Sequence, residues 1–572
     1  MRHSFLLILC LNSVLLSAQS IAINKIKLDK NLDSILKPFN IPNAPGAAIT
    51  VLQYGEVITK KNYGLANLEH NIPFTHKSPV RLVYSMTREF MSAGLAVMES
   101  EGLLHFDDKV RSYLPKLPEW SKDVTIQDLL NHSSGFDDEW SLGLLMHGSM
   151  RNRLDKEQVL TWLYNQPQPQ VEPGKGYMYC NTDYALIRFV MEIASKQSLP
   201  DYLKNKLFDP LEMSSTFMND DIDAVIPGFA ESYYGYEPFR KARFYKTSPG
   251  GNYRMVTTAD DLEKWLRAIE DPSSIVSKTF KRLYQNARPI PVMSPEQHYI
   301  FGHEWHQRDS TKYVFHGGVG DAFYVCRIPS RGIAIVGLCN SGTVGAIRQL
   351  AESLLPQKSV SISTKPAFPA KPISLTSDEL AKFAGRYFQQ NNNGYNSHLK
   401  NISFYDIKQE GDGLNLYYSK DASLPIKAFG NGLFKDMEDD VPLHFTKIHP
   451  DSMMKLKIWI PDGQILEYQR EQTKEKMNKD YFKQFTGKFY SPHLDYYFKI
   501  ILNDAGQLTI KRPTVTDKTM EIYGDNSFFF EGETGAYNFY TQATFTKNGK
   551  GEINGFNLQD SRMMHHRFDK IE

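Results

Sequence analysis

The sequence is poor in cysteine, it has few long apolar runs, and it carries no excess of charge of either sign. Four cysteines in 572 residues are too few for a disulfide scaffold, so a hydrophobic core must hold the fold. Lys and Arg number 66 against 65 Asp and Glu, which provides no strongly basic surface and argues against nucleic acid as a partner. Beyond residue 22, no segment is apolar for long enough to form a transmembrane helix.

The N-terminus has the pattern of a secretory signal peptide. A short polar start precedes an apolar run from Phe5 to Leu16, which is too short to span a bilayer comfortably, and small residues follow it. This pattern favours cleavage near Ala18 or Ala22. We therefore expect residues 1–22 to be removed and the protein to be exported, either to the periplasm or out of the cell.

Three cysteines remain after such cleavage, namely Cys180, Cys326 and Cys339. An odd and low number again excludes disulfides as the main scaffold. Cys326 and Cys339 lie in two apolar runs joined by a turn. They are therefore either neighbours across a hairpin or two separate buried thiols.

The rest of the chain divides into parts of different character. Residues 23–356 begin and end with strand–turn–strand patterns, at 46–66 and 323–339, and carry helical patterns between them, which predicts one α/β domain. Residues 357–375 are rich in Lys, Ser and Pro and predict a linker. Beyond the linker, short alternating strands separated by Gly, Asn and Asp predict two small antiparallel β-barrel-like domains. Their expected ranges are 376–473 and 474–572.

An internal repeat supports this division of the C-terminal part. The segment 380–387, LAKFAGRY, is echoed by 482–489, FKQFTGKF, and each copy follows an aspartate and leads into strand-rich sequence. Such a repeat is typical of two successive domains of the same kind. Neither copy carries a constellation of reactive side chains, so we expect the chemistry in the first domain.

Three short segments of the first domain carry side chains suited to acyl transfer. Ser85 opens a predicted helix, where its hydroxyl is near unpaired backbone N–H groups, and Arg88 follows one turn later on the same face. Tyr179 and Asn181 follow a Pro-Gly turn and offer a phenol for proton transfer and an amide to orient a carbonyl. His316 ends an apolar strand before two glycines. Each segment alone has an ordinary explanation, respectively a helix N-cap, a turn with packing tyrosines and a strand-end turn.

Together, and in this order, the three segments resemble the active site of the superfamily of serine β-lactamases, penicillin-binding proteins and D-aminopeptidases, in particular its class C β-lactamase branch. The stretch 125–135, TIQDLLNHSSG, and the stretch 257–262, TTADDL, are also similar to segments of that family. The resemblance covers about residues 30–355. The two β domains behind it make the layout similar to that of D-aminopeptidase.

The resemblance implies a role for each motif residue. Ser85 would be the nucleophile that is acylated, and Tyr179 would take its proton and later activate water for deacylation. Asn181 would orient the substrate amide, and His316 would replace the lysine of the family's Lys-Thr-Gly motif. The oxyanion hole would be formed by the backbone N–H groups of Ser85 and Val319. The residues implied in substrate binding are Asn181, Gly317, Gly318 and Val319.

One position departs from the family pattern, which has Ser-x-x-Lys where this chain has Arg88. A buried lysine can lose its proton and act as a base, whereas an arginine remains charged. Either Arg88 stabilises a Tyr179 phenolate by charge alone, so that the tyrosine performs all proton transfer, or the bulkier guanidinium misplaces Ser85. The second outcome would remove roughly the 10²–10⁴-fold rate acceleration that a positioned base supplies.

Three functions follow from these observations. The first is an exported serine hydrolase that cleaves small amides or esters, with D-amino-acid peptides, peptidoglycan fragments or carboxyl esters as substrates. The alternative is a catalytically impaired relative that binds a peptide or cell-wall fragment. The third is a β-lactamase, which is disfavoured because His316-Gly-Gly replaces Lys-Thr-Gly and because the tail domains are foreign to compact β-lactamases. The histidines lack the spacing of zinc ligands, so we expect no metal or organic cofactor. For His132, Trp140 and His147, which could wall the site, ordinary packing is the default expectation.

Overall fold

The computed structural model describes most of the chain beyond residue 22. The described residues are 23–82, 86–148, 156–221, 224–234, 239–241, 255–285, 287–292, 297–317, 323–341, 344–355, 366–369, 371–390, 404–417, 423–436, 441–447, 453–459, 465–470, 479–513, 515–524, 526–531, 540–560 and 562–572. Within these ranges, no helix combines the length and apolarity required to cross a bilayer. The predicted signal peptide lies outside them.

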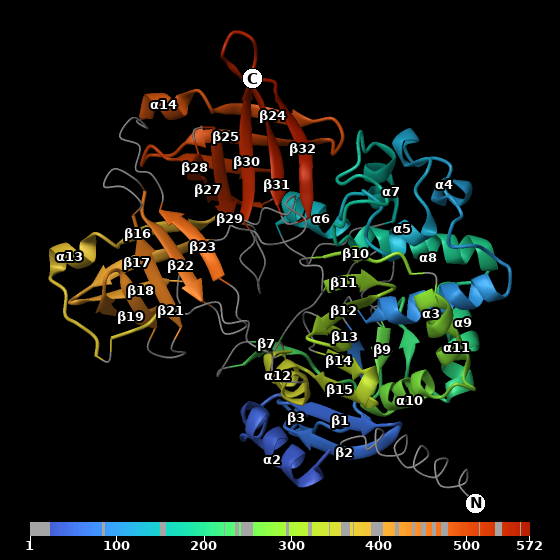
Figure 1. The fold of residues 1–572 in the computed structure, drawn as a ribbon. Helices are drawn as coiled ribbons and strands as arrows, with labels where there is room; N and C mark the ends of the chain where they lie inside the picture. The colour runs from blue at the N-terminus through green and yellow to red at the C-terminus, as the bar shows by residue number, and fades with distance from the viewer. Residues whose placement is uncertain are drawn as a thin grey trace, which may run out of the picture.

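An eight-stranded antiparallel sheet forms the centre of the first unit, in the order β10-β11-β12-β13-β14-β15-β1-β2 (Figure 1). Its strands are β1 (Ala47–Gln53), β2 (Glu56–Tyr63), β10 (Ile290–Pro291), β11 (Gln297–Ile300), β12 (His303–Arg308), β13 (Thr311–Gly317), β14 (Phe323–Ile328) and β15 (Ile333–Cys339). The two hairpins predicted from the sequence are β1–β2 and β14–β15. They lie side by side because β1 pairs with β15 over its whole length.

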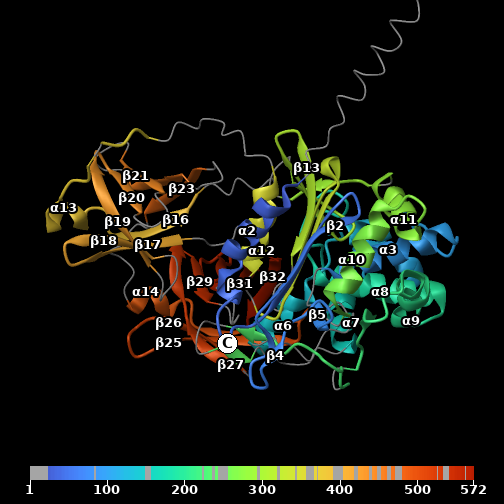
Figure 2. The same cartoon turned by 90° about the horizontal axis from the view of Figure 1, so that it is seen from below.

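Helices cover both faces of this sheet (Figure 2). Helices α2 (Lys25–Ile35) and α12 (Val344–Leu354) pack on one face, where Leu32, Ile49, Ile335 and Leu350 share a core. Helices α3 (Thr87–Ser100), α10 (Ala259–Glu270) and α11 (Ile275–Gln285) lie on the other side. Successive residues of a strand point to opposite faces, so a strand buried on both sides must be apolar throughout. Strand β1 shows this pattern, since all of its residues are buried.

The remaining helices of the first unit form a lobe beside the sheet. They are α4 (Val110–Tyr113), α5 (Ile126–Leu130), α6 (Glu139–His147), α7 (Lys156–Tyr164), α8 (Asn181–Ser195) and α9 (Leu199–Leu203). Short strands precede α3 or follow α9, namely β3 (Leu65–Asn67), β4 (Ile72–Pro73), β5 (Val80–Leu82), β6 (Phe217–Met218), β7 (Tyr233–Tyr234), β8 (Arg240–Lys241) and β9 (Met255–Thr257). Polar caps fix the helix starts. Thr125 and Asp128 form a reciprocal capping box at α5, and Thr258 caps α10.

The second unit is a closed antiparallel barrel of eight strands. They are β16 (Gly385–Gln389), β17 (Phe404–Glu410), β18 (Gly413–Tyr417), β19 (Ser423–Gly430), β20 (Leu433–Asp436), β21 (Pro442–Thr446), β22 (Lys455–Trp459) and β23 (Ile465–Arg470). The barrel closes because β16 pairs with β17 on one side and with β23 on the other. Helix α13 (Ser377–Ala381) precedes the first strand.

The third unit is a nine-stranded antiparallel sheet in the order β27-β26-β25-β24-β32-β31-β30-β29-β28. Its strands are β24 (Gly487–Ser491), β25 (Tyr496–Leu502), β26 (Leu508–Arg512), β27 (Val515–Thr519), β28 (Glu521–Gly524), β29 (Ser527–Glu531), β30 (Tyr540–Lys547), β31 (Ile553–Asp560) and β32 (Met563–Lys570), preceded by α14 (Lys479–Lys483). The two edge strands, β27 and β28, are joined by Met520 alone, so the sheet curves almost to closure. Two barrel-like units thus follow an α/β unit, which confirms the predicted fold class.

The internal repeat forms the same local structure in both barrel-like units. A short helix is followed by a glycine at the start of a strand, Gly385 with φ +141° and Gly487 with φ +146°. Residues other than glycine rarely adopt this backbone conformation. A Cβ at Gly487 would also clash with the backbone oxygen of Glu572. The repeated glycine is therefore required by the geometry of the turn from helix to strand.

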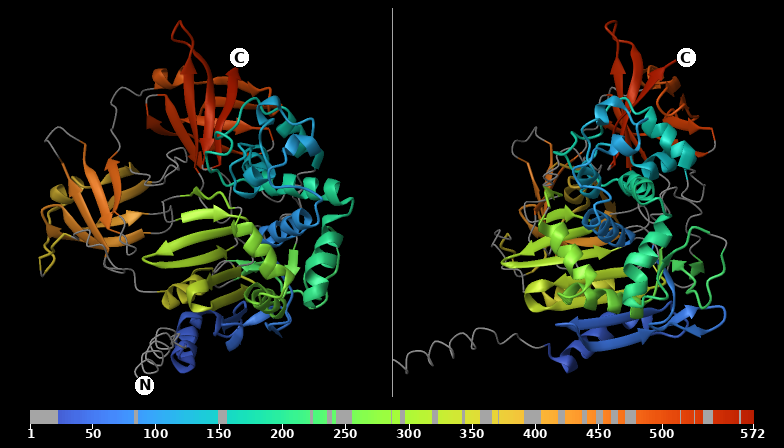
Figure 3. Two further views of the ribbon diagram at one scale, coloured as in Figure 1. Left: turned by 45° about the vertical axis from the view of Figure 1, so that its right-hand side comes forward. Right: turned by 90° about the vertical axis from the view of Figure 1, so that its right-hand side faces the viewer.

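The third unit packs against the helical lobe of the first (Figures 1 and 3). The hydroxyl of Tyr496 donates to the backbone oxygen of Met146 at 3.0 Å, and Arg512 donates to that of Leu145 at 3.2 Å. Buried apolar residues of both units belong to a single hydrophobic cluster. By contrast, the closed barrel has a core of its own. It contacts the third unit through an aromatic group that includes Phe388 and Phe529.

Candidate active site

Two helix starts bring the predicted site residues together. Helix α3 begins at Thr87, so Arg88 lies in its first turn, and α8 begins with Asn181 after the extended residue Cys180. The two helices pack against each other. Arg88 is fully buried, at 0% exposure, and its guanidinium donates to the side-chain oxygen of Asn181.

The guanidinium of Arg88 is enclosed by aromatic rings as well as by hydrogen-bond acceptors. Its central carbon lies 4.3 Å from the centre of the Tyr179 ring and 5.0 Å from that of Tyr184. Its Nη1 lies 3.0 Å from Nε2 of His132. A cation over an aromatic face is attracted by the ring quadrupole, and the attraction grows when water is excluded. These contacts fix the position of the Arg88 guanidinium.

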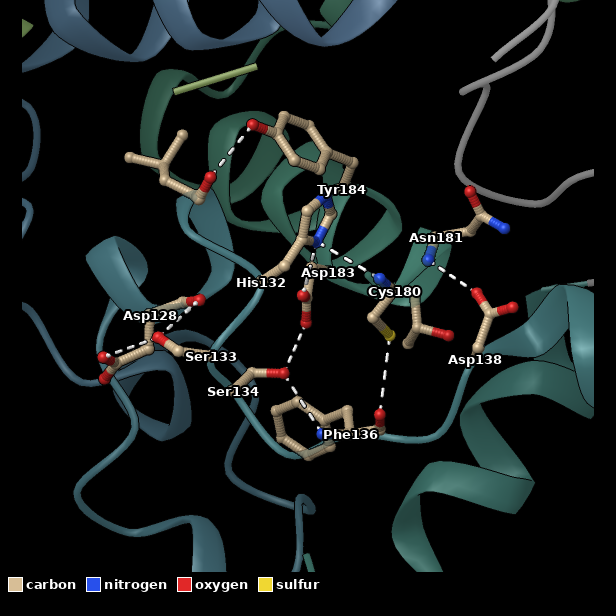
Figure 4. Close-up of polar contacts among 12 residues, drawn as sticks. Asp128, His132, Ser133, Ser134, Phe136, Asp138, Cys180, Asn181, Asp183 and Tyr184 are labelled. Atoms are coloured by element: carbon tan, nitrogen blue, oxygen red, sulfur yellow. Dashed lines mark hydrogen bonds and ion pairs between the residues drawn. The ribbon is translucent and has the colours of Figure 1, made fainter. Parts of the chain in front are cut away.

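His132 continues the network away from Arg88 (Figure 4). Because arginine is only a donor, Nε2 of His132 must accept, and the proton of the neutral imidazole therefore lies on Nδ1. Nδ1 is 2.9 Å from a carboxyl oxygen of Asp183, whose other oxygen accepts from the hydroxyl of Ser134. The ring of His132 also lies 4.5 Å from that of Tyr179, centre to centre. His132 thus links the candidate phenol, the buried cation and a buried carboxyl group.

Burial controls the protonation of this network. Burial, assisted by the positive charges of Arg88 and Arg562, lowers the pKa of His132 well below its usual value, so the imidazole is neutral. Burial raises the pKa of Asp183 well above its usual value, while the hydroxyl of Ser134 and the charge of Arg88 offset part of this effect. His132 therefore acts as a neutral hydrogen-bonding bridge between the guanidinium of Arg88 and the carboxyl group of Asp183.

His316 borders the same group of rings from the sheet. It lies near the end of β13, is buried, and has a pKa lowered to about 4, chiefly by burial. The ring of Tyr299 lies between it and the rest of the site, at 6.1 Å from His316, 5.7 Å from Tyr179 and 4.6 Å from His132. A histidine with this pKa is neutral near pH 7 and can both donate and accept a hydrogen bond.

The structure therefore tests the predicted constellation only in part. It brings Arg88, Tyr179 and Asn181 together around one guanidinium, and it places His316 next to them through Tyr299. Gly317 follows His316 in β13. The predicted nucleophile and two residues of the predicted oxyanion region lie outside the described residues, and their roles stay predictions. These residues are Ser85, Gly318 and Val319.

The third unit adds a residue that the sequence analysis did not identify. Arg562, just before β32, places its guanidinium carbon 4.8 Å from the centre of the Tyr179 ring and 5.0 Å from that of Trp140. Its Nη1 lies 3.8 Å from a carboxyl oxygen of Asp138. The other oxygen of Asp138 accepts from the backbone N–H of Asn181 at 2.6 Å. Two arginines from distant parts of the chain thus approach the same phenol.

His132 and Trp140 also differ from expectation, since ordinary packing was the default for both. His132 lies within hydrogen-bonding distance of Arg88 and its ring contacts that of Tyr179, and Trp140 contacts Arg562. For His132, the family-like stretch 125–135 already contained the signal. For Arg562, no local pattern in the sequence marks the residue, because its contacts depend on how the third unit docks.

Comparison with known proteins identifies the family of the first unit. The β-lactamase family model matches residues 32–354, more than half of the chain. The chain belongs to the β-lactamase family. Penicillin-binding protein 4* of Bacillus subtilis (strain 168) is 27% identical over 187 residues, which is 33% of this chain and 41% of that protein. D-aminopeptidase of Gluconobacter oxydans (strain 621H) is 24% identical over 283 residues, 48% of this chain and 51% of that protein. The matches thus span about half the length of these relatives.

The β-lactamase-family fold is also found in solved structures. The octameric penicillin-binding protein homologue from Pyrococcus abyssi superposes with a TM-score of 0.52 and 20% identity, over 85% of this chain and 98% of that one. At this identity the likeness shows the fold alone. In this β-lactamase-family chain, Arg88 supplies a permanent positive charge beside a phenol, and it cannot accept a proton. Proton transfer in the site would therefore use a group other than Arg88, such as the nearby Tyr179 or His132.

Proposed function

We propose that the protein is an exported serine hydrolase that cleaves small amides or esters through an acyl-enzyme on Ser85. The observation that carries the proposal is the placement of Arg88, 4.3 Å from the ring of Tyr179 and bonded to Asn181. This arrangement brings a potential proton acceptor, a fixed cation and an amide that can orient a carbonyl into one neighbourhood. Groups of these kinds assist acyl transfer when they lie around the nucleophile.

In the proposed reaction, Tyr179 accepts the proton of Ser85 and later activates the water that releases the acyl group. The guanidinium groups of Arg88 and Arg562 lie 4.3 and 4.8 Å from its ring, so they stabilise the phenolate, which is the form of Tyr179 that can accept a proton. Asn181 orients the carbonyl of the substrate. Arg88 contributes by charge alone, which is the first of the two outcomes that its presence leaves open.

His132 and His316 have supporting roles in this proposal. His132 holds the guanidinium of Arg88 through Nε2 and is itself held by Asp183, which fixes the cation relative to Tyr179. His316 is neutral because its pKa is about 4, so it presents an N–H to the substrate rather than a full charge. A neutral donor suits an ester or amide carbonyl better than it suits binding of a free carboxylate.

The relatives indicate which substrates to test. One relative is named a D-aminopeptidase and another a penicillin-binding protein. We therefore propose D-amino-acid peptides, peptidoglycan fragments and carboxyl esters as substrate candidates. The segment 1–22, with its signal-like pattern, supports a periplasmic or secreted location where peptidoglycan fragments are present.

Active-site labelling tests the proposal directly. Protein comprising residues 23–572 is incubated with a fluorophosphonate or a fluorescent penicillin, and its intact mass is recorded. We expect one adduct per chain, lost in Ser85→Ala and kept in Ser112→Ala, a control at an exposed serine of α4. No adduct in the wild-type protein, or an unchanged adduct in Ser85→Ala, would overturn the assignment of the nucleophile.

Arg88→Lys tests whether Arg88 supports the site by its charge or misplaces Ser85. If the site is adapted to a fixed charge, lysine loses the bidentate contacts to Asn181 and His132, and labelling slows. If Arg88 instead impairs the site, the Arg88→Lys variant is labelled faster than the wild-type protein. Absence of an adduct together with thermal stabilisation by a peptidoglycan fragment would favour the alternative function, a binding protein that uses the same residues.

A further inference from the structure

Three side chains from two units meet where the third unit docks on the first. Asp137 lies between α5 and α6, His493 lies in the turn between β24 and β25, and His566 lies on β32. One carboxyl or imidazole atom from each residue lies within 4.8 Å of the others. Asp137 and His566 are each 1% exposed, and the side chain of His493 is 11% exposed. The cluster is therefore almost completely enclosed by the interface.

The distances in this cluster match those between ligands of one small cation. Oδ2 of Asp137 lies 3.2 Å from Nε2 of His493, and Oδ1 lies 3.3 Å from Nε2 of His566. Zinc bonds to imidazole nitrogen and carboxylate oxygen are about 2.0–2.2 Å long, which places neighbouring ligand atoms of a tetrahedron about 3.3–3.5 Å apart. Two imidazoles and one carboxylate are a common donor set for zinc and related divalent metals.

His566 provides a second, independent indication. Neither of its ring nitrogens makes a well-aligned hydrogen bond within the described part of the chain, although the side chain is almost fully buried. Leaving a buried polar group unsatisfied costs about 1–3 kcal/mol. The ring is nearly parallel to that of His493, with centres 5.4 Å apart and planes 14° apart, and its Nε2 points toward Asp137. A metal ion would satisfy this nitrogen.

The surroundings hold the carboxylate in place. Nε2 of Gln170 donates to Oδ1 of Asp137 at 2.6 Å, and its Oε1 accepts from the backbone N–H of Met564 at 2.6 Å. Gln170 thus ties Asp137 to the strand that carries His566. Outer hydrogen bonds of this kind orient metal ligands and are part of most metal sites. Nε2 of His493 lies 3.1 Å from the backbone oxygen of Trp162, so metal binding would move its proton to Nδ1.

We propose that Asp137, His493 and His566 bind one divalent transition-metal ion, with zinc as the first candidate, and that the ion joins the third unit to the first. The spacing of the histidines in the sequence predicted no metal, because the ligands are contributed by two units rather than by one local motif. The role we propose for the ion is to join the two units, because its ligands come from both. The site lies beside Asp138, and it anchors β32, the strand that follows Arg562.

Metal content and titration of the full chain test this proposal without reference to activity. The protein is treated with a chelator, exchanged into metal-free buffer, and titrated with Zn²⁺ or Co²⁺ against a chromophoric chelator. We expect one equivalent of tightly bound Zn²⁺ and a visible Co²⁺ absorption band typical of nitrogen and oxygen ligands. His493→Ala and His566→Ala should weaken binding by more than the 10–100-fold typical of lost outer-shell contacts. His105→Ala, a change at an exposed histidine, should have no effect.

The same experiment can overturn the proposal. If the wild-type protein takes up no stoichiometric metal at micromolar Zn²⁺, the three side chains form only a hydrogen-bonded charged cluster. Binding that is unchanged in His493→Ala would also refute the site. If His566→Ala does not fold, His493→Ala decides the question, because His493 is partly exposed and lies in a turn. Circular dichroism establishes that the variant used is folded.

Discussion

Glu89 offers the sharpest test of how the buried charges of α3 hold the first unit. It follows Arg88 directly but points into the core, where it accepts from Nε1 of Trp265 at 2.7 Å. Its other carboxyl oxygen lies 2.9 Å from Nε2 of His303. The buried guanidinium of Arg327 lies behind that histidine, at 3.5 Å from the same nitrogen. Glu89→Gln keeps the shape and the acceptor for Trp265 but removes the negative charge.

The size of the effect follows from the pKa of Glu89. Burial alone would raise this pKa, but the imidazole of His303, the charge of Arg327 and the N–H of Trp265 together lower it from 4.5 to about 2. The difference between a pKa of 4.5 in the unfolded chain and about 2 in the folded protein corresponds to about 3 kcal/mol of folding free energy. Because the folded pKa is the lower one, this stabilisation is present above pH 4.5 and is lost as the pH falls toward 2. The glutamine variant lacks it at every pH.

Urea unfolding followed by tryptophan fluorescence measures this contribution. At neutral pH we expect Glu89→Gln to lower the free energy of unfolding by about 3–5 kcal/mol, since it also leaves Arg327 without its carboxylate. The difference from wild type should shrink on acidification toward pH 2. Glu101→Gln, at the partly exposed end of the same helix, should cost less than about 1 kcal/mol. A variant as stable as wild type, or a difference that does not change with pH, would refute the reasoning.

Three further predictions concern the other units and the site. The imidazole of His316 should titrate in NMR spectra near pH 4, because burial lowers its pKa, and a midpoint near 6.5 would contradict the burial. Since the unfolded chain takes up this proton at higher pH, acidification should also lower the free energy of unfolding. Gly487→Ala should destabilise the third unit by about 1–3 kcal/mol, seen as a lower melting temperature, whereas Gly549→Ala, in open space, should not; equal melting temperatures would argue against strain. Arg562→Met should slow fluorophosphonate labelling about 2- to 30-fold, whereas Arg567→Met should not. An unchanged labelling rate in Arg562→Met would show that the third unit does not contribute to the reaction.

Most of the fold could be predicted because its signals are local. The apolar run 47–53 and its turn specify β1 and β2, and the hydroxyl and acid at Thr125 and Asp128 specify the start of α5. The repeat around Gly385 and Gly487 specifies two related β units because the same turn from helix to strand requires glycine in both. Such features are encoded within a few residues of sequence.

The candidate site could be predicted only where its residues belong to such segments. Arg88, Tyr179 and Asn181 lie at helix starts that the motifs mark, and the structure brings them together. Arg562 and the cluster around His566 could not be predicted, because their contacts arise from packing between units far apart in the chain. The register and docking of a β sheet depend on the whole interface, which no short pattern encodes.

The hydrophobic cluster shared by the first and third units has a consequence for synthesis. The face of the helical lobe that packs on the third unit stays uncovered until β32 has left the ribosome and paired. Until then its apolar surface is exposed, so a chain shortened after the closed barrel should aggregate rather than yield an independent fragment. The barrel between them has a core of its own and could fold earlier. A deletion that spares both ends of the chain should therefore be better tolerated than a truncation at the C-terminus.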